Sequence, residues 1–591
     1  MTKILGISCF YHDSAAALIN DGEIITAIQE ERITRIKNDQ NFPSNAIKEI
    51  CSINKLNLSE IDYFVFYEKP ILKFDRILQS YIKTAPFYFK SFLKNMPLWV
   101  KDKLFQKSKI LKELQKIDNK VKQESIFFSE HHHSHAASSF YTSCYERSLI
   151  LTLDAVGEWA TSSISIGNKN KIQILEEMHF PNSVGMLYSA FTYYCGFAVN
   201  EGEYKLMGLA PYGEPIYVDI IKEKLIEIYE DGSCKINIEY FDYITGFRMV
   251  NEKFFQIFKK KNRERDDPID KFYMDIAASI QFVLEEIVIK ICKYSKQKYN
   301  INNLCLAGGV ALNCVANGKI FSENIFENIW IQPASGDSGG CIGAALAFWY
   351  DHLNNERKIS QNKRDYMKGS LLGPSYETSK IEKFLEENNI QYQKLEYNKM
   401  AETISDYLSK QKIIGLFTNK MEFGPRALGS RSIIADPRSE KMQRELNLRT
   451  KFRESFRPFA PAILKEYYNQ WFEGNYESPY MLFVSKIKEE KMIKQKINSG
   501  TLEIINNKRS EIPAVTHVDF SARIQTVDKI NNPFFYQIID KFREKTGIPL
   551  VVNTSFNLKD EPIVCSPEDA YKCFMTNNID YLVLENFLIS K

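Results

Sequence analysis

Residues 148–167 read Ser-Leu-Ile-Leu-Thr-Leu-Asp-Ala-Val-Gly-Glu-Trp-Ala-Thr-Ser-Ser-Ile-Ser-Ile-Gly, and this stretch predicts the fold of the N-terminal part of the chain. An apolar strand is followed by a turn that contains Asp154, and a second strand comes directly after the turn. Residues 4–19 have the same layout, with His12 in the turn between their strands. Two such units in one region predict an internally duplicated α/β fold.

A histidine-rich segment, residues 129–137, lies just before the second unit and holds four of the chain's eight histidines. The small and aromatic residues that follow predict a helix that runs into the core. His131 and His135 are four residues apart and share one face of that helix, the usual spacing for two imidazoles on one metal ion. Asp154 ends a strand, where ligands bind in open α/β sheets, and is a natural third metal ligand.

The other two histidines of this segment, His132 and His133, are expected to face substrate or solvent. The alternative to a metal site is a polar helix start with hydrogen-bonded histidines. The zinc-protease motif H-E-x-x-H is excluded, because position 132 holds His where that motif needs Glu.

Two strand–loop–helix segments follow between residues 303 and 350. The loop of the first contains Gly308 and Gly309, which would let backbone N–H groups approach a phosphate or a sugar; a lone Gly-Gly pair is weak evidence. The loop of the second, Ser-Gly-Asp-Ser-Gly-Gly, contains Asp337, which we predict to be the fourth metal ligand. Two histidines and two carboxylates suit iron or zinc better than magnesium.

Length and composition describe a globular protein of several domains. The chain has 591 residues, 44% hydrophobic and 26% charged, with a net charge of +3 that demands neither nucleic acid nor an acidic membrane. It begins with a short apolar strand where a signal peptide would lie, and no apolar run reaches about 18 residues, the length of a membrane span. The 11 cysteines form no C-x-x-C pair, which favours reduced thiols in a cytoplasmic protein.

Three further segments bear on the organisation of the chain. Residues 30–39 are densely charged and fit a solvated helix or a ligand-facing loop equally well. Residues 70–125 interleave Lys with aromatics; a helical arm packed on the body is favoured over a membrane-surface helix, because the apolar residues form no one-sided stripe. Residues 353–368 are polar and read as a linker between a domain at 1–352 and another at 369–591.

The C-terminal part contains cationic residues among glycine, proline and aromatic residues, in the segments 422–438 and 451–462. Such rigid surroundings favour a polyanion held by two-pronged contacts over a solvated surface. Arg523 adds a further cation, and the strand at 550–552 ends in Asn-Thr-Ser. This set would suit a nucleoside triphosphate and a small polar group.

Taken together, these motifs resemble the NodU/CmcH family of O-carbamoyltransferases, which includes nodulation-factor, cephamycin and tobramycin carbamoyltransferases. The resemblance rests on the H-x-x-x-H helix, the Gly-Gly-Val-Ala-Leu-Asn and Ser-Gly-Asp-Ser-Gly loops, Phe-Gly-Pro-Arg-Ala-Leu-Gly-Ser-Arg-Ser and Asn-Thr-Ser-Phe-Asn, and it covers essentially the whole chain. It implies an actin-like N-terminal domain similar to the tRNA threonylcarbamoyl transferase, and a C-terminal YrdC-like α/β domain. Where the family often has Gly-Glu-Pro-Ile, this chain has Lys559-Asp560-Glu561-Pro562-Ile563.

The resemblance also implies two half-reactions. The C-terminal domain would form carbamoyl-adenylate from carbamoyl phosphate and ATP with Mg²⁺, and the N-terminal domain would transfer the carbamoyl group to a hydroxyl of a small-molecule or sugar acceptor. Carried over to this sequence, the metal, Fe(II) or a similar transition metal, would be held by His131, His135, Asp154 and Asp337. The adenylate and its precursors would be held by Arg426, Lys451, Arg457, Arg523, Asn553 and Ser555, while Gly308, Gly309 and Asn313 would contact nucleotide.

These roles make chemical sense. Arg and Lys neutralise two polyanionic substrates, and a metal polarises a mixed anhydride as a Lewis acid. His12 would sit by the acceptor and take its proton, since an unperturbed imidazole has a pKa of about 6.5. No nucleic acid or membrane partner is expected, and a homodimer is the assembly considered.

Two rival classes are a tRNA threonylcarbamoyl transferase-like modification enzyme and a non-catalytic nucleotide-binding regulator of actin-like fold. The near-neutral charge and the second cationic site disfavour the first, and the metal cluster has no use in the second.

Overall fold

The computed structural model describes residues 1–360, 363–493 and 508–591. They divide into two compact units. Unit 1 comprises Met1–Glu30 and Asn38–Tyr366, and unit 2 comprises Glu31–Lys37 and Met367–Lys591. The short segment Glu31–Lys37 therefore packs with the C-terminal part of the chain although its sequence neighbours belong to unit 1.

The first sheet of unit 1 is formed by the N-terminal strands and two later ones. Its strand order is β3-β2-β1-β4-β5, with the first three strands antiparallel and the last two added in parallel. The bounds are β1 Lys3–Ser8, β2 Ala15–Asn20, β3 Glu23–Gln29, β4 Tyr63–Phe66 and β5 Ile126–Phe128. Asp21 and Gly22 both have positive φ, as the tight turn between β2 and β3 requires.

The second sheet of unit 1 repeats the first. Its order is β8-β7-β6-β11-β12, again with three antiparallel strands followed by two parallel ones. The bounds are β6 Arg147–Leu153, β7 Ala160–Asn168, β8 Lys171–His179, β11 Asn303–Ala307 and β12 Asn328–Ile331. The matching order and directions confirm the predicted duplicated, actin-like α/β fold.

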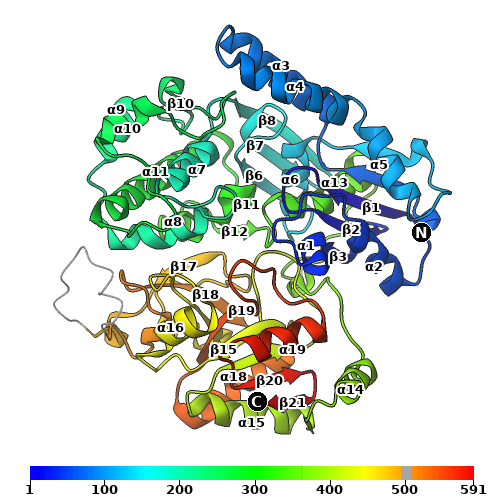
Figure 1. Cartoon of the computed structure of the whole chain (residues 1–591), viewed down its shortest axis with the longest axis vertical. Coiled ribbons are helices and arrows are strands. Elements are labelled where there is room, and N and C mark those ends of the chain that lie inside the picture. The colour runs from blue at the N-terminus through cyan, green and yellow to red at the C-terminus, as the bar shows by residue number, and fades with distance from the viewer. Residues whose placement is uncertain (361–362, 494–507) are drawn as a thin grey trace. The chain divides into compact units, whose positions relative to one another are not determined.

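Two helices occupy the middle of unit 1, α6 (His131–Phe140) and α13 (Gly340–Ala347), each following the last strand of its half (Figure 1). They pack on each other; α6 also packs on β6 and β11, and α13 packs on β1 and β2. The contact is close: a Cβ at Gly343 would overlap the backbone oxygen of Ser134, and a Cβ at Gly6 would overlap that of Cys341. Each half therefore supplies a helix to the sheet of the other half.

Helical insertions extend both halves. A hairpin of α3 (Pro70–Thr84) and α4 (Phe89–Leu104), followed by α5 (Gln106–Gln115), separates β4 from β5, and α2 (Ser44–Asn54) separates β3 from β4. Figure 1 shows α3 and α4 side by side, and Ile77, Tyr81 and Met96 join them in a small apolar cluster. The second half carries α7 Val184–Tyr194, α8 Glu203–Leu209, α9 Val218–Lys224, β9 Ile226–Ile228, β10 Cys234–Ile236, α10 Glu252–Phe258, α11 Lys271–Tyr299 and α12 Cys314–Ser322.

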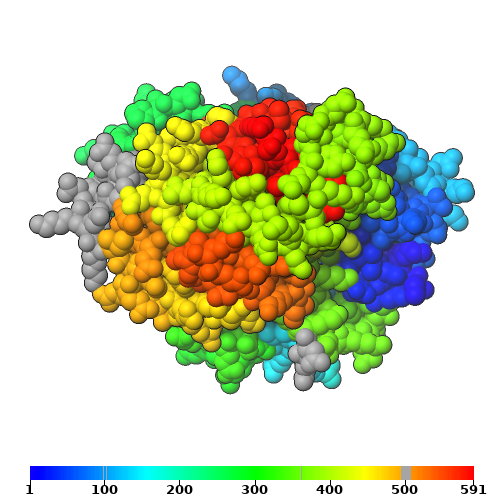
Figure 2. All heavy atoms as spheres, turned by 90° about the horizontal axis from the view of Figure 1, so that it is seen from below, coloured from blue at the N-terminus to red at the C-terminus, as the bar shows by residue number. Residues whose placement is uncertain are grey.

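Unit 2 is built on a mixed sheet of order β13-β21-β20-β14-β15-β19-β16-β18-β17 among the described residues. Its strands are β13 Gln393–Lys394, β14 Ile414–Phe417, β15 Arg431–Ala435, β16 Ala460–Leu464, β17 Phe483–Lys486, β18 Ser521–Val527, β19 Leu550–Ser555, β20 Tyr581–Leu584 and β21 Phe587–Ser590. Its helices are α14 Thr378–Glu387, α15 Tyr397–Ser409, α16 Met442–Glu445, α17 Tyr468–Trp471, α18 Pro533–Thr546 and α19 Pro567–Thr576. Helices α15 and α18 pack side by side, and Figure 2 shows α18 in orange on the surface of this unit. The C-terminal α/β domain is thus present as predicted.

Two global expectations can be compared with the structure. All 11 cysteines are free, as expected for reduced thiols. Among the described residues, every helix is either too short or too polar to cross a bilayer.

We expect Gly343→Ala to destabilise unit 1, because the new methyl group can be accommodated only if α6 and α13 move apart. Overpacking of this kind costs about 1–3 kcal/mol, more than the helix propensity gained by replacing Gly with Ala. Thermal denaturation should show a lower melting temperature. Gly336→Ala is the matched control, because the nearest atom to its added Cβ lies 3.9 Å away. Equal melting temperatures for the two variants would contradict the close helix contact.

Candidate functional site

Two histidines of α6 meet at the buried face of this helix. His131 and His135 lie one turn apart, their Nε2 atoms are 3.1 Å from each other, and both side chains are almost fully buried. The side chain of Glu130, the residue before the helix, does not cap the helix N-terminus. Instead, the carboxylate of Glu158 accepts the His131 backbone N–H at 3.0 Å. Glu158 also accepts the Lys69 backbone N–H at 2.6 Å. This carboxylate fixes the start of the histidine helix, and its negative charge stabilises the helix N-terminus.

Two carboxylates face these imidazoles. Asp154 follows β6, and its Oδ2 lies 2.9 Å from His131 Nε2 and 3.8 Å from His135 Nε2. Asp337 opens the short helix before α13, and its Oδ1 lies 3.7 Å from His131 Nε2 and 3.5 Å from His135 Nε2. All four ligand atoms lie within 4.8 Å of one another. The duplicated fold brings together the four residues that the sequence singled out as metal ligands.

This geometry fits a transition metal. Metal–ligand distances of about 2.0–2.2 Å place neighbouring ligand atoms about 3.0–3.5 Å apart, close to the separations found here. Burial disfavours ionised carboxylates, but the hydrogen bond from His131 and the nearby imidazoles hold the pKa of Asp154 well below its ordinary value. Burial opposes a charged imidazole at His131, yet Asp337 and Asp154 raise its pKa to about 9. A buried concentration of negative charge therefore surrounds the imidazole nitrogens, and protons and a cation would compete for it.

His12 lies beside this cluster, in the turn between β1 and β2. Its Nε2 is 3.6 Å from Asp337 Oδ2, and its Nδ1 is 3.0 Å from Asp13 Oδ2. Burial lowers the imidazole pKa, but Asp337 and Asp13 outweigh this and raise it to about 9. This pKa differs from the unperturbed value expected from the sequence because two carboxylates flank the ring.

The other two histidines of the segment do not share one environment. His132 is buried, its Nδ1 lies 3.2 Å from Ser163 Oγ, and burial lowers its pKa to about 3. Of the two surroundings predicted for this ring, substrate or solvent, the structure excludes solvent, because the ring packs inward against β7. His133 is half-buried, and its Nε2 lies 2.8 Å from Asp351 Oδ2.

The Gly-Gly loop after β11 contacts the same cluster. Gly308 has φ of 89°, and its position against the Leu153 backbone leaves no room for a Cβ. Gly309 donates its backbone N–H to Asp154 Oδ1 at 3.0 Å. Asn313 caps α12 through Ala316 N–H, and its Nδ2 donates to Gln281 Oε1 at 3.0 Å. The sequence predicted nucleotide contacts for all three residues; here, Gly309 orients a cluster carboxylate and Asn313 holds a helix start.

In unit 2, Lys451 is buried among neutral oxygens. Its Nζ lies 2.5 Å from the Ser555 carbonyl oxygen, 3.2 Å from Ser555 Oγ and 2.5 Å from Asn557 Oδ1. Burial, reinforced by the positive charges of Arg453, Arg457 and Lys37, holds the pKa of Lys451 well below its ordinary value. Lys451 and Ser555, predicted to share a site, do lie together.

The remaining predicted residues of unit 2 lie on neighbouring strands and loops. Asn553 and Ser555 are two residues apart on β19, so their side chains lie on the same face of the sheet. Asn553 Nδ2 donates to Gln525 Oε1 at 2.7 Å and to the Ala427 carbonyl at 3.2 Å. Arg523 shares a face of β18 with Gln525, and Arg426 precedes Ala427 in the loop before β15. Arg457 lies in the loop after Lys451, and Asn447 Nδ2 holds that loop through the Arg457 carbonyl at 2.9 Å.

The charged segment near the N-terminus also contributes to unit 2. Arg32 is buried and donates to the Gly424 carbonyl at 2.8 Å, which excludes a fully solvated helix. Arg35 donates to the carbonyls of Ile563 and Pro562 at 2.6 and 2.7 Å. Asp560 has φ of 61° in the loop where the family often has glycine. Aspartate tolerates this left-handed conformation better than most residues, so the loop can form without glycine.

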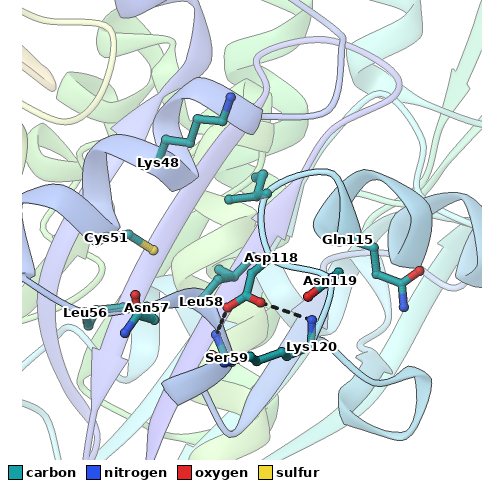
Figure 3. A pocket seen from close by; sticks show the side chains of 11 residues that line it. Lys48, Cys51, Leu56, Asn57, Leu58, Ser59, Gln115, Asp118, Asn119 and Lys120 are labelled. Carbon is teal, nitrogen blue, oxygen red and sulfur yellow. Dashed lines mark hydrogen bonds between the residues drawn. The ribbon is translucent and has the colours of Figure 1, made fainter.

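A groove of about 660 Å³ lies elsewhere in unit 1 (Figure 3). It runs between the end of α2 and the turn after α5, and its lining includes Cys51, Asn57 and Asp118. Asp118 accepts the backbone N–H groups of Ser59 and Lys120 at 3.0 Å each, so its carboxylate serves the local turns. The predicted site residues do not line this groove.

Comparison with known proteins agrees with this arrangement. A protein of Synechocystis sp. is 49% identical over 100% of this chain and 97% of its own length. The nodulation protein NolNO of Sinorhizobium fredii is 34% identical over 98% of this chain and 79% of its own length. The nodulation protein U of Rhizobium tropici is 25% identical over 100% of this chain and 96% of its own length.

Similarity to solved structures is weak. HypF of T. kodakarensis aligns with 60% of this chain and 48% of its own at 12% identity, with a TM-score of 0.31. Family models give a much clearer match. The carbamoyltransferase N-terminus model covers residues 3–346, which include the histidine–aspartate cluster, and the carbamoyltransferase C-terminus model covers residues 405–591, which include Lys451 and its neighbours. The chain therefore belongs to the carbamoyltransferase family.

Proposed function

We propose that this protein is an O-carbamoyltransferase that forms carbamoyl-adenylate in unit 2 and transfers the carbamoyl group to an acceptor hydroxyl in unit 1. The observation that carries this proposal is the buried cluster of His131, His135, Asp154 and Asp337 with His12 at its side, in a chain of the carbamoyltransferase family. ATP, with Mg²⁺, and carbamoyl phosphate are the co-substrates.

The first half-reaction needs a cationic site. Carbamoyl phosphate loses its phosphate to water, the carbamate oxygen bonds to the α-phosphorus of ATP, and pyrophosphate leaves. Negative charge accumulates on phosphoryl oxygens in each step, and positioned cations stabilise it. Lys451 and Arg457 supply that charge, and Arg426, Arg523, Asn553 and Ser555 bind the nucleotide and carbamoyl parts. Lys451 is suited to this role because its present partners are neutral oxygens that substrate oxygens can replace.

The second half-reaction joins the acceptor oxygen to the carbamoyl carbon, and AMP leaves. His12 in its neutral form accepts the proton of the acceptor hydroxyl, because it is the half-buried imidazole beside the cluster. A cation held by Asp337 would offset the negative charge that raises the His12 pKa, and would so favour the neutral ring. His131, His135, Asp154 and Asp337 hold a transition metal, for which we propose Fe(II), and the metal would supply Lewis-acid polarisation of the carbamoyl group. Glu158 keeps the histidine helix in register, and Gly309 orients Asp154.

The overall test is ATP–pyrophosphate exchange that depends on carbamoyl phosphate, combined with mass spectrometry of candidate hydroxyl acceptors for the gain of one carbamoyl group. Exchange that proceeds equally well without carbamoyl phosphate would refute the proposal. Binding of bulk tRNA with a steep loss of affinity at higher salt would favour a tRNA-modifying enzyme instead.

We expect the wild-type protein to retain about one transition-metal ion per chain, as one four-ligand site implies, and His135→Ala to lose it. The removed imidazole supplies one of the four ligand atoms. Elemental analysis of the purified proteins measures the metal. His179→Ala is the matched control, because that imidazole is exposed and pairs with Glu177, away from the cluster. Metal retained equally by His135→Ala and the wild type would contradict the site.

Lys451→Ala should lower the rate of pyrophosphate release by about 10²–10³-fold, the usual effect of removing one preorganised donor from a developing anion. It should leave transfer from supplied carbamoyl-adenylate intact, because the acceptor chemistry is assigned to unit 1. Lys399→Ala removes an exposed lysine of the same unit and serves as the control. Loss of both half-reactions in Lys451→Ala, with a folded protein, would refute the division of labour.

His12→Asn should show the reverse pattern. Loss of a general base costs about 10²–10⁴-fold in acceptor carbamoylation, whereas pyrophosphate release should continue at the wild-type rate. Both products are measured in the same reaction mixture. His133→Asn, which alters a histidine paired with Asp351, controls for general effects on unit 1. If His12→Asn stops pyrophosphate release as completely as carbamoylation, His12 is not the base of the transfer step.

A further inference from the structure

Arg76, on α3, is a buried cation without an acidic partner. Only 8% of the residue is exposed. Its Nη1 donates to the Gly157 carbonyl at 2.9 Å, and its guanidinium lies 5.2 Å from the centroid of the Phe180 ring. Among the described residues it forms no ion pair with a carboxylate. Burial lowers its pKa, although the charges of Tyr11, Glu68 and Glu158 offset part of this effect.

Two other buried arginines of the described structure, Arg357 and Arg431, each donate to several backbone carbonyl oxygens. Arg357 donates to the carbonyls of Tyr145, Phe140 and Ser143, and Arg431 donates to those of Thr418, Asn419, Ser430 and Pro374. Both guanidinium groups therefore hold loops and strand ends together. Among the described residues, Arg76 donates to one carbonyl, and its other guanidinium nitrogens are not among the buried unpaired atoms. These nitrogens are therefore accessible to solvent and to an anionic ligand.

Arg76 lies next to the histidine–aspartate cluster. A Cβ built on its partner Gly157 would lie 3.0 Å from His131 Cβ, so this glycine packs directly on a cluster histidine. On the same face of α3, three residues earlier, Lys73 places its Nζ 5.0 Å from the centroid of the Tyr11 ring. The Tyr11 ring centroid lies 4.7 Å from that of His12, and Tyr11 is 44% exposed. The two cations of α3 thus flank the transfer site on a side that is open to solvent.

The nearby acids are already engaged. Glu68 pairs with both Lys73 and Lys103, at 2.5 and 2.9 Å, so one carboxylate serves two ammonium groups. Glu158 accepts the backbone N–H groups of Lys69 and His131. Asp75 of α3 accepts from Gln79 and Trp159, so among the described residues no carboxylate forms an ion pair with Arg76.

We propose that Arg76, assisted by Lys73, forms an oxyanion-binding subsite beside the transfer site. The guanidinium stacked near Phe180 presents a planar set of donors that suits a phosphoryl, sulfate or carboxylate group. The inference rests on the proposed function in that the ligand is either the adenylate phosphate or an anionic group carried by the acceptor.

The test uses the full-length protein in a Lys451→Ala background, so that the cationic site of unit 2 is already weakened, and inorganic phosphate as the probe. Phosphate should raise the melting temperature of this protein in a saturable way, because a ligand that binds only the folded state stabilises it. Adding Arg76→Gln should weaken phosphate binding about tenfold or more, as expected when charged hydrogen bonds are lost. Arg76→Lys should give an intermediate affinity, because a lysine offers a point charge without the planar donors.

Lys90→Gln is the matched control, since it removes the same charge from an exposed position of the same helical hairpin. It should leave phosphate binding unchanged. Without phosphate, Arg76→Gln should melt no lower than its background, because the fold gains little from an uncompensated buried charge. A clearly lower melting temperature would identify Arg76 as structural and overturn the proposal, as would phosphate titrations that coincide with and without Arg76→Gln.

AMP separates the two sources of the anion. If AMP displaces phosphate and Arg76→Gln weakens both ligands alike, the subsite binds the adenylate phosphate. If phosphate still binds under saturating AMP, and Arg76→Gln leaves AMP affinity unchanged, the subsite binds an anionic group of the acceptor. Pyrophosphate release, measured for Arg76→Gln with Lys451 intact, should stay at the wild-type rate. If neither Arg76→Gln nor the wild-type protein releases pyrophosphate, the proposed function is refuted. That result would not bear on the subsite, which is tested by phosphate binding.

Discussion

The close contact between α6 and α13 is the constraint on which the transfer site depends. Gly343 has no side chain, so the backbone of α6 at Ser134 can approach α13 directly. His131 and His135 come from the first of these helices, and Asp337 lies at the start of the second. Because each helix follows the last strand of one half, the duplication itself places ligands from both halves at one point. A bulkier residue at position 343 would overlap the Ser134 backbone and force α6 and α13 apart.

That convergence concentrates charge among buried side chains. Asp154 and Asp337 are buried, and the neighbouring imidazoles lower the pKa values of both carboxyl groups, while these carboxylates raise the pKa of His131. Isolated buried charges of this kind would be strongly unfavourable, so the cluster is stable only as a set. Glu158 and the Gly309 N–H fix the set from outside, through the helix start and through Asp154. A cation that replaces the shared protons would satisfy the same oxygens and nitrogens without rearrangement of the backbone.

The sequence predicted what local spacing encodes and missed what only tertiary contacts create. The i,i+4 histidines and the paired strand–turn–strand units are local patterns, and the cluster and the duplicated sheets followed from them. Glu158 was missed because it caps α6 from 27 residues away. The segment Glu31–Lys37 could not be assigned, since its partners Gly424 and Ile563 lie several hundred residues away in the sequence. The burial of His132, which excludes solvent contact, depends on β7 and could not be read from the local sequence. The raised pKa of His12 was missed because Asp337 comes from the other half.

The partners that each buried cation contacts distinguish structural from functional roles better than its burial does. Arg431 is fully buried, lies 3.6 Å from the centroid of the Phe417 ring, and is surrounded by carbonyl oxygens. Lys103 is paired with Glu68, which fixes it as part of the fold. Among the described residues, Lys451 donates to neutral oxygens alone, and Arg76 donates to one carbonyl oxygen. Folding stability favours the first two arrangements, whereas the last two leave charge that the protein itself does not neutralise. Residues kept at a cost in stability mark the places where a ligand completes the interaction, and in this chain both lie beside groups suited to the chemistry of phosphoryl and carbamoyl compounds.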